Sequence, residues 1–558
     1  MSDATPSWLT RAYLAGFAGW FAIVLALGLV WALAFPYHEW DAFAFSELSR
    51  AISRGDYDIS DFPAAYVNRP LFYVAQGGVW SVFGFSFSAG RLLGLAFFAL
   101  LVVASAGLAG RGKLRSLEAA LAGLVILSIP AVLANAVAGL TDVPAAAMVA
   151  ASSALALRTE GGRRRAVVLG TVVFLTVLTK PSVLGPVIVL LIILVLRRGS
   201  GSWRRRAGCV PPWVGAATGL VAGLGVHALA AAWLDVGPAD YLTNGTGGLW
   251  AQRAAAERWD ALARFDVLGA ALRLPLAFAL LYAAGRGAGL RHRLAGPVAL
   301  AGAVVWFVVG GMVGDTPDRD LWAAETLFAS AGFLALLALF CACDDRDAPE
   351  RRSLVELAAL AIVPLGVWWY ATPYADRLAS TSWPAAAALL AVVVAVPLRR
   401  LATSAGVAAL APAIVLLVPL WVAMSGFDGF GSPHWRETRS LGWGGLWNED
   451  RTLNIVLPSV QSSVAVVRPL LADGGILVTP DPRFVYWFAD QTRTDYAFTC
   501  DQLGGTAAYI LVTSDEARSY MESRGSTADP AFWASCTTPK LEQLTDGSNG
   551  FAVFAVKD

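Results

Sequence analysis

The chain has 558 residues, of which 57% are hydrophobic and only 15% are charged. Soluble globular proteins carry about 25% charged residues, so this deficit excludes an ordinary soluble enzyme and indicates a polytopic α-helical membrane protein. The net charge of +1 creates no field that would attract nucleic acid, and we exclude nucleic acid as a partner.

A spanning helix needs about 20 apolar residues, and thirteen apolar runs are candidates. The first run is too long for the core of a signal peptide and no small-residue cleavage site follows it, so we interpret it as an uncleaved span. The candidates are 13–35, 90–110, 117–139, 143–158, 166–179, 183–196, 208–234, 265–285, 294–314, 321–343, 353–371, 382–398 and 403–424. A further stretch, 71–88, is ambiguous.

Basic residues decide the topology, because cytoplasmic loops are enriched in Lys and Arg. Six loops hold 20 Lys and Arg in total, whereas the loops that alternate with them hold 9. The six lie on one side only if 71–88 does not cross the membrane and 166–196 is a hairpin broken at "TKPS". Lys180 followed by Pro181 supplies that break, because proline removes a donor and its preceding residue avoids the helical region.

With a cytoplasmic N-terminus, thirteen spans place the C-terminus outside the cytoplasmic membrane. We therefore predict a multi-pass membrane domain over 1–427 and a soluble extracytoplasmic α/β domain over 428–558. The first outer loop, 36–88, contains the interfacial element 71–88.

The outer domain has a recognisable alternation of elements. Three stretches are predicted strands and one, with a Ser or Asp cap, is a predicted helix. The strands are 474–480, 507–513 and 550–558, and the helix is 514–524. Cys500 and Cys536 would form a disulfide in this oxidising compartment, with two unpaired thiols as the alternative.

This topology gathers the unusual polar side chains on the outer face. They are Glu39, Asp41, Glu47, Asn68, Arg69, Asp142, Lys180, Asp315, Asp320, Glu325, Asp376 and Arg377. Ionisable groups near a membrane are costly unless they line a cavity or face water. We therefore predict an outer cavity that holds several carboxylates and a few cations.

Most of these side chains also have a purely structural interpretation. Asp41 and Asp142 each stand near a predicted helix start, where Asp is a favoured cap. Glu47 lies three residues before Arg50, and we prefer a surface ion pair of little energetic weight for it.

Two of the cations differ in this respect. Arg377 follows Asp376 directly and could pair with it. Lys180 has no acid near it in the sequence, so its only structural role would be to extend its amine toward water along an apolar stem.

No nucleophile motif is present: the chain lacks GxSxG, a P-loop and HExxH. Carboxylates and cations suit transfer from an activated phosphate ester to a hydroxyl. A carboxylate removes the acceptor proton, and Lys and Arg stabilise the charge on the phosphate leaving group. A lipid tail on the donor would account for a site at the membrane surface.

Several motifs follow one another in an informative order. After the acidic stretch "FPYHEWDAFAFSELSR" come "NRPLFYVAQGGVW", "GRLLGLAF", "TDVP" and "LTKP", and then the outer domain. This order resembles the GT-C superfamily of integral membrane glycosyltransferases, in particular its aminoarabinose transferase and protein O-mannosyltransferase branch. The motifs cover residues 13–200, and beyond them the resemblance rests on the number of spans.

The resemblance implies roles for individual residues. Asp41 matches the family's catalytic carboxylate at the start of an interfacial helix, with Glu39 as a candidate second acid. Asp142 matches a further acid of the catalytic site, which we expect to position the acceptor or the base. Three cations, Arg69, Lys180 and Arg377, match groups that bind the donor phosphate.

The resemblance leaves the cofactor open. Asn68 stands where some relatives carry a metal-associated Glu, so we assign no cofactor and leave a divalent cation open. The implied partners are a polyprenyl-phosphate-linked sugar donor, membrane lipid, and a glycan, lipid or protein acceptor.

The resulting expectation is an inverting enzyme that transfers a single sugar. Tyr486 and Trp487 in the outer domain are candidates for stacking on an acceptor glycan, and core packing is their alternative. A lipid-linked sugar flippase or transporter, and an oligosaccharide polymerase or ligase, are the alternative functions.

Overall fold

A computed structural model describes part of the chain. These residues fall into two compact units: the first is Met1–Val30, Leu93–Leu229 and Gly248–Arg439, and the second is Trp31–Leu92, Ala230–Gly247 and Ser440–Asp558. The described segments are 7–34, 40–57, 67–110, 112–128, 130–158, 162–196, 210–242, 387–388, 391, 395, 398, 458–472, 475–479, 492–494, 509–512, 541–544 and 552–556.

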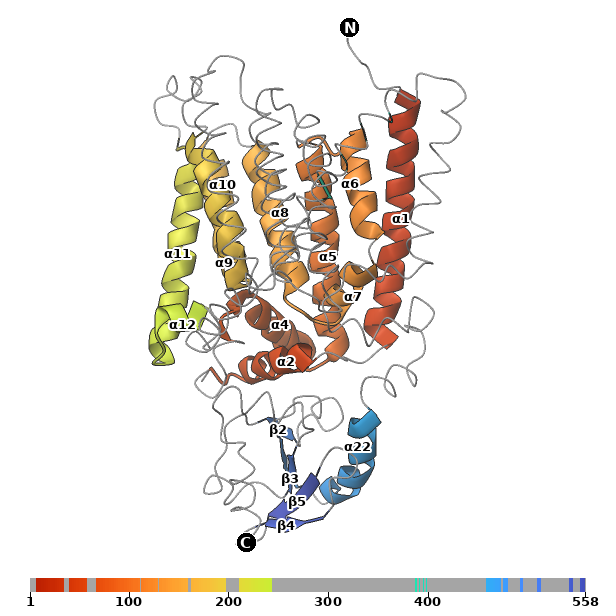
Figure 1. The fold of residues 1–558 in the computed structure, drawn as a ribbon, viewed down its shortest axis with the longest axis vertical. Coiled ribbons are helices and arrows are strands. Elements are labelled where there is room, and N and C mark those ends of the chain that lie inside the picture. The colour runs from red at the N-terminus through yellow and green to blue at the C-terminus, as the bar shows by residue number, and fades with distance from the viewer. Residues whose placement is uncertain are drawn as a thin grey trace, which may run out of the picture. The chain divides into compact units, whose positions relative to one another are not determined.

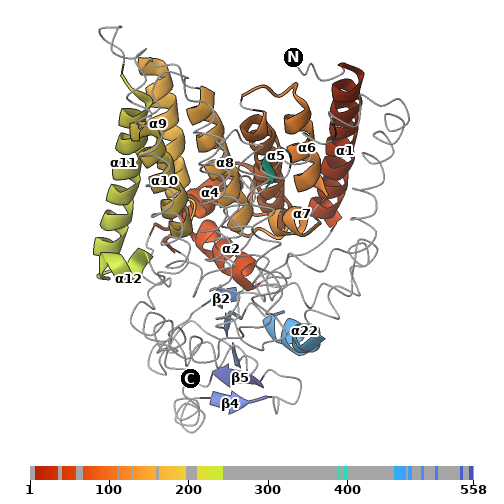
Figure 2. The same ribbon diagram turned by 45° about the horizontal axis from the view of Figure 1, so that its top comes forward.

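The first unit contains a group of helices, the longer of which run side by side (Figures 1 and 2). They are α1 (Ser7–Ala34), α5 (Phe87–Ala109), α6 (Leu117–Leu127), α7 (Pro130–Val137), α8 (Asp142–Arg158), α9 (Arg163–Val177), the 3₁₀ turn η1 (Pro181–Val183), α10 (Leu184–Leu196) and α11 (Pro212–Trp233). Some of these helices lie wholly in this unit, and α1, α5 and α11 lie in it for most of their length. Among the described residues, three stretches are long and apolar enough to cross a membrane: Trp8–Val30, Ser88–Ala109 and Pro212–Trp233.

Apolar side chains from most of these helices form one buried cluster. Its larger members are Leu9, Tyr13, Leu108, Leu117, Leu121, Leu169, Val173, Val177, Leu190 and Leu194. Ala388, Ala391 and Ala395 join it at helical spacing. Apart from these and two neighbouring positions, the predicted spans from 265–285 onward lie outside the described residues.

Helices α9 and α11 approach each other through glycines. A Cβ added at Gly215 would overlap the carbonyl O of Ala166, and one added at Gly219 would overlap the carbonyl O of Gly170. A Cβ at Gly170 would lie 2.7 Å from the carbonyl O of Gly215. The two backbones can therefore come this close only because these positions lack side chains.

The predicted span 117–139 is wrong as a single helix. The chain forms α6 and α7 instead, with the break between Ser128 and Pro130. Proline has no N–H to continue the ladder and disfavours the helical conformation in the residue before it. Ser128 ends α6 by donating from Oγ to the Leu124 carbonyl at 2.6 Å.

In the second unit, α2 (Trp40–Ser53) and α4 (Pro70–Phe83) pack together (Figures 1 and 2). Phe45 meets Phe72 edge to face at 5.8 Å, and Ser49 Oγ donates to Gln76 Oε1 at 2.9 Å. At 14 residues α4 is shorter than the about 20 that a span needs, as an interfacial element requires. Gly84, at φ 80°, ends it in a conformation that favours glycine.

The same unit contains the short helix α12 (Pro238–Leu242), the helix α22 (Pro458–Leu471) and a five-stranded sheet. The strand order is β2-β1-β3-β5-β4, with β1 parallel to β2 and β3, and β5 antiparallel to β3 and β4. Leu477 pairs with Tyr509, and Tyr509 with Ala555. The strands are β1 (Leu477–Thr479), β2 (Thr492–Thr494), β3 (Tyr509–Val512), β4 (Leu541–Gln543) and β5 (Ala552–Val556).

Three of these strands, β1, β3 and β5, confirm the predicted strands, whereas β2 and β4 were not predicted. The predicted helix 514–524 lies outside the described residues, as do Tyr486, Trp487, Cys500 and Cys536. The domain boundaries at 1–427 and 428–558 stay a prediction.

Candidate functional site

The chain turns between α9 and α10 at the predicted break, which is confirmed. Helix α9 ends at Val177, and Thr179 Oγ1 donates to the Thr176 carbonyl at 2.6 Å. Lys180 is extended, at φ −168° and ψ 140°, the conformation that a following proline favours. Pro181 then starts the 3₁₀ turn, where its missing N–H costs no helical hydrogen bond.

Helix α8 lies against α9 and is hydrogen-bonded to it through Thr176, near the end of α9. The hydroxyls of Ser152 and Thr176 lie 2.8 Å apart, and Thr176 Oγ1 also donates to the Met148 carbonyl at 3.2 Å. Val183 packs with Ala145 near the first turn of α8. The N-terminus of α8 therefore lies beside the residues that follow α9.

These contacts bring Lys180 and Asp142 together. Lys180 Nζ lies 2.5 Å from Asp142 Oδ1, in an ion pair between residues 38 apart in the chain. The lysine side chain is 6% exposed and the aspartate side chain 29%. Lys180 therefore has a counter-charge that the sequence did not reveal, and its amine is held in place at a helix break.

Asp41 is the second residue of α2, which begins at Trp40. It thus lies inside the first helical turn, two positions beyond the cap position, so the alternative of Asp41 as the cap is wrong. Negative charge is favourable in this turn because the backbone N–H groups there carry partial positive charge. Glu39 lies outside the described residues.

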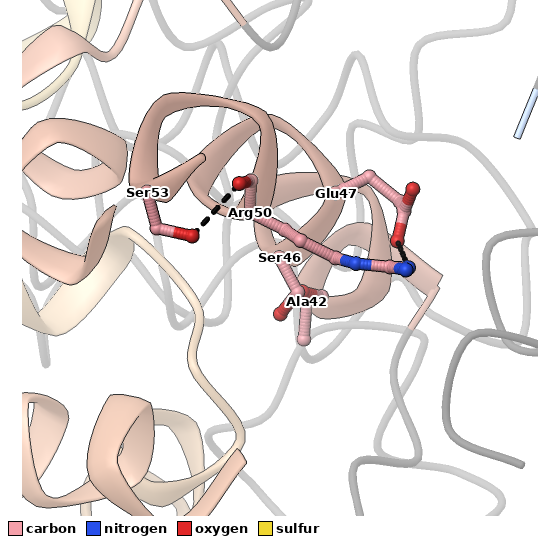
Figure 3. Close-up of polar contacts among 5 residues, drawn as sticks. All are labelled: Ala42, Ser46, Glu47, Arg50 and Ser53. Carbon is pink, nitrogen blue, oxygen red and sulfur yellow. Dashed lines mark hydrogen bonds and ion pairs between the residues drawn. The ribbon is translucent and has the colours of Figure 1, made fainter. Parts of the chain in front are cut away.

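The ion pair between Glu47 and Arg50 is confirmed, at 3.4 Å, but its predicted surface location is wrong (Figure 3). The side chains are 11% and 4% exposed respectively. The Arg50 guanidinium carbon lies 5.4 Å from the centre of the Phe85 ring, which helps to bury it. Arg50 therefore belongs to the interior of the second unit.

Arg69 stands immediately before α4 and is also buried, with 6% of its surface exposed. Its guanidinium carbon lies 4.8 Å from the centre of the Phe45 ring on α2. Asn68 beside it is fully buried and donates from Nδ2 to the Tyr241 carbonyl at 3.1 Å. Tyr241, on α12, is a neighbour that the sequence gave no reason to expect.

The predicted site residues thus occur in both units. Asp142 and Lys180 form a pair in the first, whereas Asp41 and Arg69 belong to the packed α2 and α4 of the second. Arg377 lies outside the described residues. Among the described residues, no three His, Cys, Asp or Glu side chains gather as a metal site would need, and we assign no ligands to a cation.

No protein-family model matches the chain, and no curated protein sequence does. Solved structures are similar to it. ArnT from Cupriavidus metallidurans, bound to undecaprenyl phosphate, has a TM-score of 0.45 at 14% identity, over 96% of this chain and 97% of that chain. The Archaeoglobus fulgidus oligosaccharyltransferase, with Zn and sulfate, has a TM-score of 0.44 at 11% identity, over 96% and 73%.

A second structure from Archaeoglobus fulgidus, AglB with an inhibitory peptide and a dolichol-phosphate, has a TM-score of 0.42 at 12% identity, over 97% of this chain and 74% of that chain. These neighbours are GT-C glycosyltransferases, the superfamily that the motifs resemble. Similarity at this level assigns no activity to the chain.

Proposed function

We propose that the chain is an inverting glycosyltransferase that moves a single sugar from a polyprenyl-phosphate donor to a hydroxyl of a glycan, lipid or protein. The reaction takes place at the outer face of the cytoplasmic membrane. The proposal combines the order of the motifs with the geometry of the described site residues.

The observation that carries the proposal is the ion pair of the buried Lys180 with the partly exposed Asp142. Burying a cation near a membrane costs free energy. Such a cation is therefore found where it binds an anion or lines an ion pathway. Of the two motifs that hold this pair, the GT-C resemblance links "LTKP", with Lys180, to the lipid phosphate of the donor, and "TDVP", with Asp142, to a further acid of the site. A phosphate that carries a lipid tail is an anion delivered at this depth.

The proposed chemistry is a single displacement. The Asp41 carboxylate takes the proton of the acceptor hydroxyl, and the oxygen attacks the anomeric carbon from the face opposite the phosphate. The bond between that carbon and the phosphate oxygen breaks, and its electron pair leaves with the polyprenyl phosphate. One displacement inverts the anomeric centre.

The cations act on the leaving group. Lys180, Arg69 and Arg377 stabilise the charge that builds on the phosphate, since charge-assisted hydrogen bonds to phosphate are the stronger ones. Asp142 holds the Lys180 amine until phosphate shares or replaces that contact. Glu39 is the candidate for a second acid near Asp41.

The test replaces Asp41 by Asn, which keeps the shape of the side chain and removes its charge. Purified protein is supplied with undecaprenyl-phosphate-linked monosaccharides, and product is measured by mass and anomeric configuration. We expect kcat to fall by about 100-fold or more, the usual size of a general-base contribution. Asp56→Asn, at an exposed acid beyond the same helix, is the matched control.

The outcomes separate this function from its alternatives. Near-normal turnover by folded Asp41→Asn removes the base role. A product that carries many sugars indicates a polymerase or ligase. Movement of the lipid-linked sugar across the bilayer without a covalent product indicates a flippase.

A further inference from the structure

The segment Val67–Asn68, just before Arg69, is held by two tyrosines from different parts of the chain. Tyr73 on α4 and Tyr241 on α12 donate from their hydroxyls to the same Val67 carbonyl, at 3.2 Å and 3.1 Å. A carbonyl oxygen has two lone pairs, so it accepts both bonds. Residues 67 and 241 are thereby joined across 174 positions of sequence.

This contact lies in a dry environment. Val67 and Tyr241 are fully buried and Tyr73 is 5% exposed, in a cluster with Leu48 of α2 and Ala231 of α11. A buried carbonyl without hydrogen-bond donors destabilises the folded state, so loss of these bonds would lower the free energy of unfolding. Burial raises the pKa of both tyrosines, and the nearby Tyr73 further raises that of Tyr241. Both hydroxyls therefore stay protonated and able to donate at neutral pH.

A return bond completes the contact. Asn68 Nδ2 donates to the backbone carbonyl of Tyr241 at 3.1 Å, so each segment holds the other. Helix α12 has five residues, too few to be stable alone, and its order therefore depends on contacts such as these.

Arg69 follows this fixed segment directly. Pro70 stands after it and keeps its backbone out of the helical region, at φ −127° and ψ 52°, short of the ψ of about 120–160° that a following proline favours. The guanidinium then lies against the Phe45 ring. The two residues before it and the Phe45 ring are thus among the groups that set its position.

We propose that Tyr73 and Tyr241 are positioning residues for donor binding, which act through the Val67 carbonyl to place the Arg69 guanidinium. This inference rests on the proposed function, in which Arg69 binds the donor phosphate. Through Tyr241, the segment that follows α11 controls how tightly the phosphate is bound.

The experiment measures the Kd of the full-length protein for undecaprenyl phosphate. The variants are Tyr73→Phe, Tyr241→Phe and the double variant, which remove hydroxyls and keep the rings. We expect each single variant to weaken binding by about two- to tenfold, the usual worth of one hydrogen bond. The double variant should raise the Kd by more than the product of the two single-variant fold-changes, because in each single variant the remaining hydroxyl still bonds to the Val67 carbonyl. Tyr57→Phe, at a tyrosine that is 66% exposed, is the control.

A second background separates positioning from stability. In Arg69→Met protein, Tyr241→Phe should lower the melting temperature as before but should no longer change the Kd. A purely structural role predicts that any effect on Kd is the same in both backgrounds. The single variants decide the matter if the double variant does not fold.

Two results overturn the proposal, and they differ. If the unmodified protein and the tyrosine variants bind undecaprenyl phosphate equally well while Arg69→Met binds weakly, the positioning role is wrong and the proposed function stands. If the unmodified protein does not bind undecaprenyl phosphate at all, the proposed function fails and this inference fails with it.

Discussion

Lys180 shows how one side chain is kept charged in an apolar setting. Its surface is 5% exposed, and its counter-charge comes from Asp142 at the start of the neighbouring α8. In such surroundings a carboxylate and an amine attract each other more strongly than in water, while each alone would be costly to bury. The effects of the two residues on the free energy of unfolding should therefore be coupled, whereas each residue should have its own role in catalysis.

This behaviour gives a prediction at the residue scale. Lys180→Met and Asp142→Asn should each lower the free energy of unfolding by about 1–3 kcal/mol, because each leaves one polar group without its partner. The value is below that of a fully buried pair, since the Asp142 side chain is 29% exposed. The double variant should be more stable than either single variant. All three variants should lose turnover of the lipid-linked sugar donor.

Thermal unfolding in detergent and single-turnover kinetics measure these two effects. Equal stability losses that simply add in the double variant would contradict a coupled pair. Full activity in folded Lys180→Met would remove the phosphate role of this lysine.

Some features of these ion pairs can be predicted from the sequence, and others cannot. Lys180 is visible because a cation stands between two apolar runs, and its break is visible because Pro181 follows. Its pairing with Asp142 is not visible, since it depends on how α8 lies beside α9. Glu47 and Arg50 are predictable as a pair because they are three residues apart on one helix. Their burial near Phe85 is not predictable, because it too depends on how segments pack together.

At the scale of elements, α9 and α11 are held at close range by positions without side chains. Gly215 and Gly219 face backbone carbonyls of α9, which cannot move aside as a flexible side chain can. Without a strong hydrophobic drive between helices in lipid, such close packing is a principal source of association.

The element-scale prediction compares three glycines on one helix. Gly215→Ala and Gly219→Ala should each lower the free energy of unfolding by about 1–3 kcal/mol, because the added methyl forces the helices apart. Gly225→Ala is the matched control, since nothing lies within 4 Å of the Cβ it would add. Thermal unfolding and the yield of folded protein in detergent measure the difference.

If Gly225→Ala destabilises the protein as much as Gly219→Ala, close contact is not the cause. A measured gain in stability for Gly219→Ala would show that α9 and α11 are farther apart than described.

Breaks between elements were only partly predictable. The break at Pro181 is predictable, because the alternation of basic loops also requires a turn there. Pro130 carries the same local signal but lies inside an otherwise continuous apolar run, so 117–139 was predicted as one helix. The strands β2 (TRT) and β4 (LEQ) are short and mostly polar, and they lack the consecutive apolar residues that make the equally short β1 (LVT) recognisable. The bond from Tyr241 to Val67 has no sequence signal at all.

For the molecule as a whole, the distribution of basic residues predicts which side each loop faces. The six loops rich in Lys and Arg would lie in the cytoplasm, and the residues from 428 onward would lie outside. The described helices include three stretches able to cross a membrane, and the order of sides remains a prediction from charge.

Reporter fusions test this topology. Alkaline phosphatase fused after Asp558 should be active in a bacterial host, because the enzyme needs the oxidising exterior. The same reporter fused after Arg115, at the end of the loop "RGKLR", should be inactive, and a green fluorescent protein fused there should be bright. The reverse pattern at either position would show that the number or direction of spans is wrong.

The shortness of α9 bears on the lipid around the protein. The helix has 15 residues, so it is about 22 Å long, against about 30 Å for the hydrocarbon layer of a bilayer. Its first three residues are arginines, which shortens the part that suits lipid tails. For α9 as a predicted span, this length predicts a hydrophobic mismatch, which local thinning of the bilayer or a Lys180 amine below the level of the headgroups would meet. Turnover should accordingly depend on acyl-chain length, with thin bilayers bringing headgroups and lysine to the same depth.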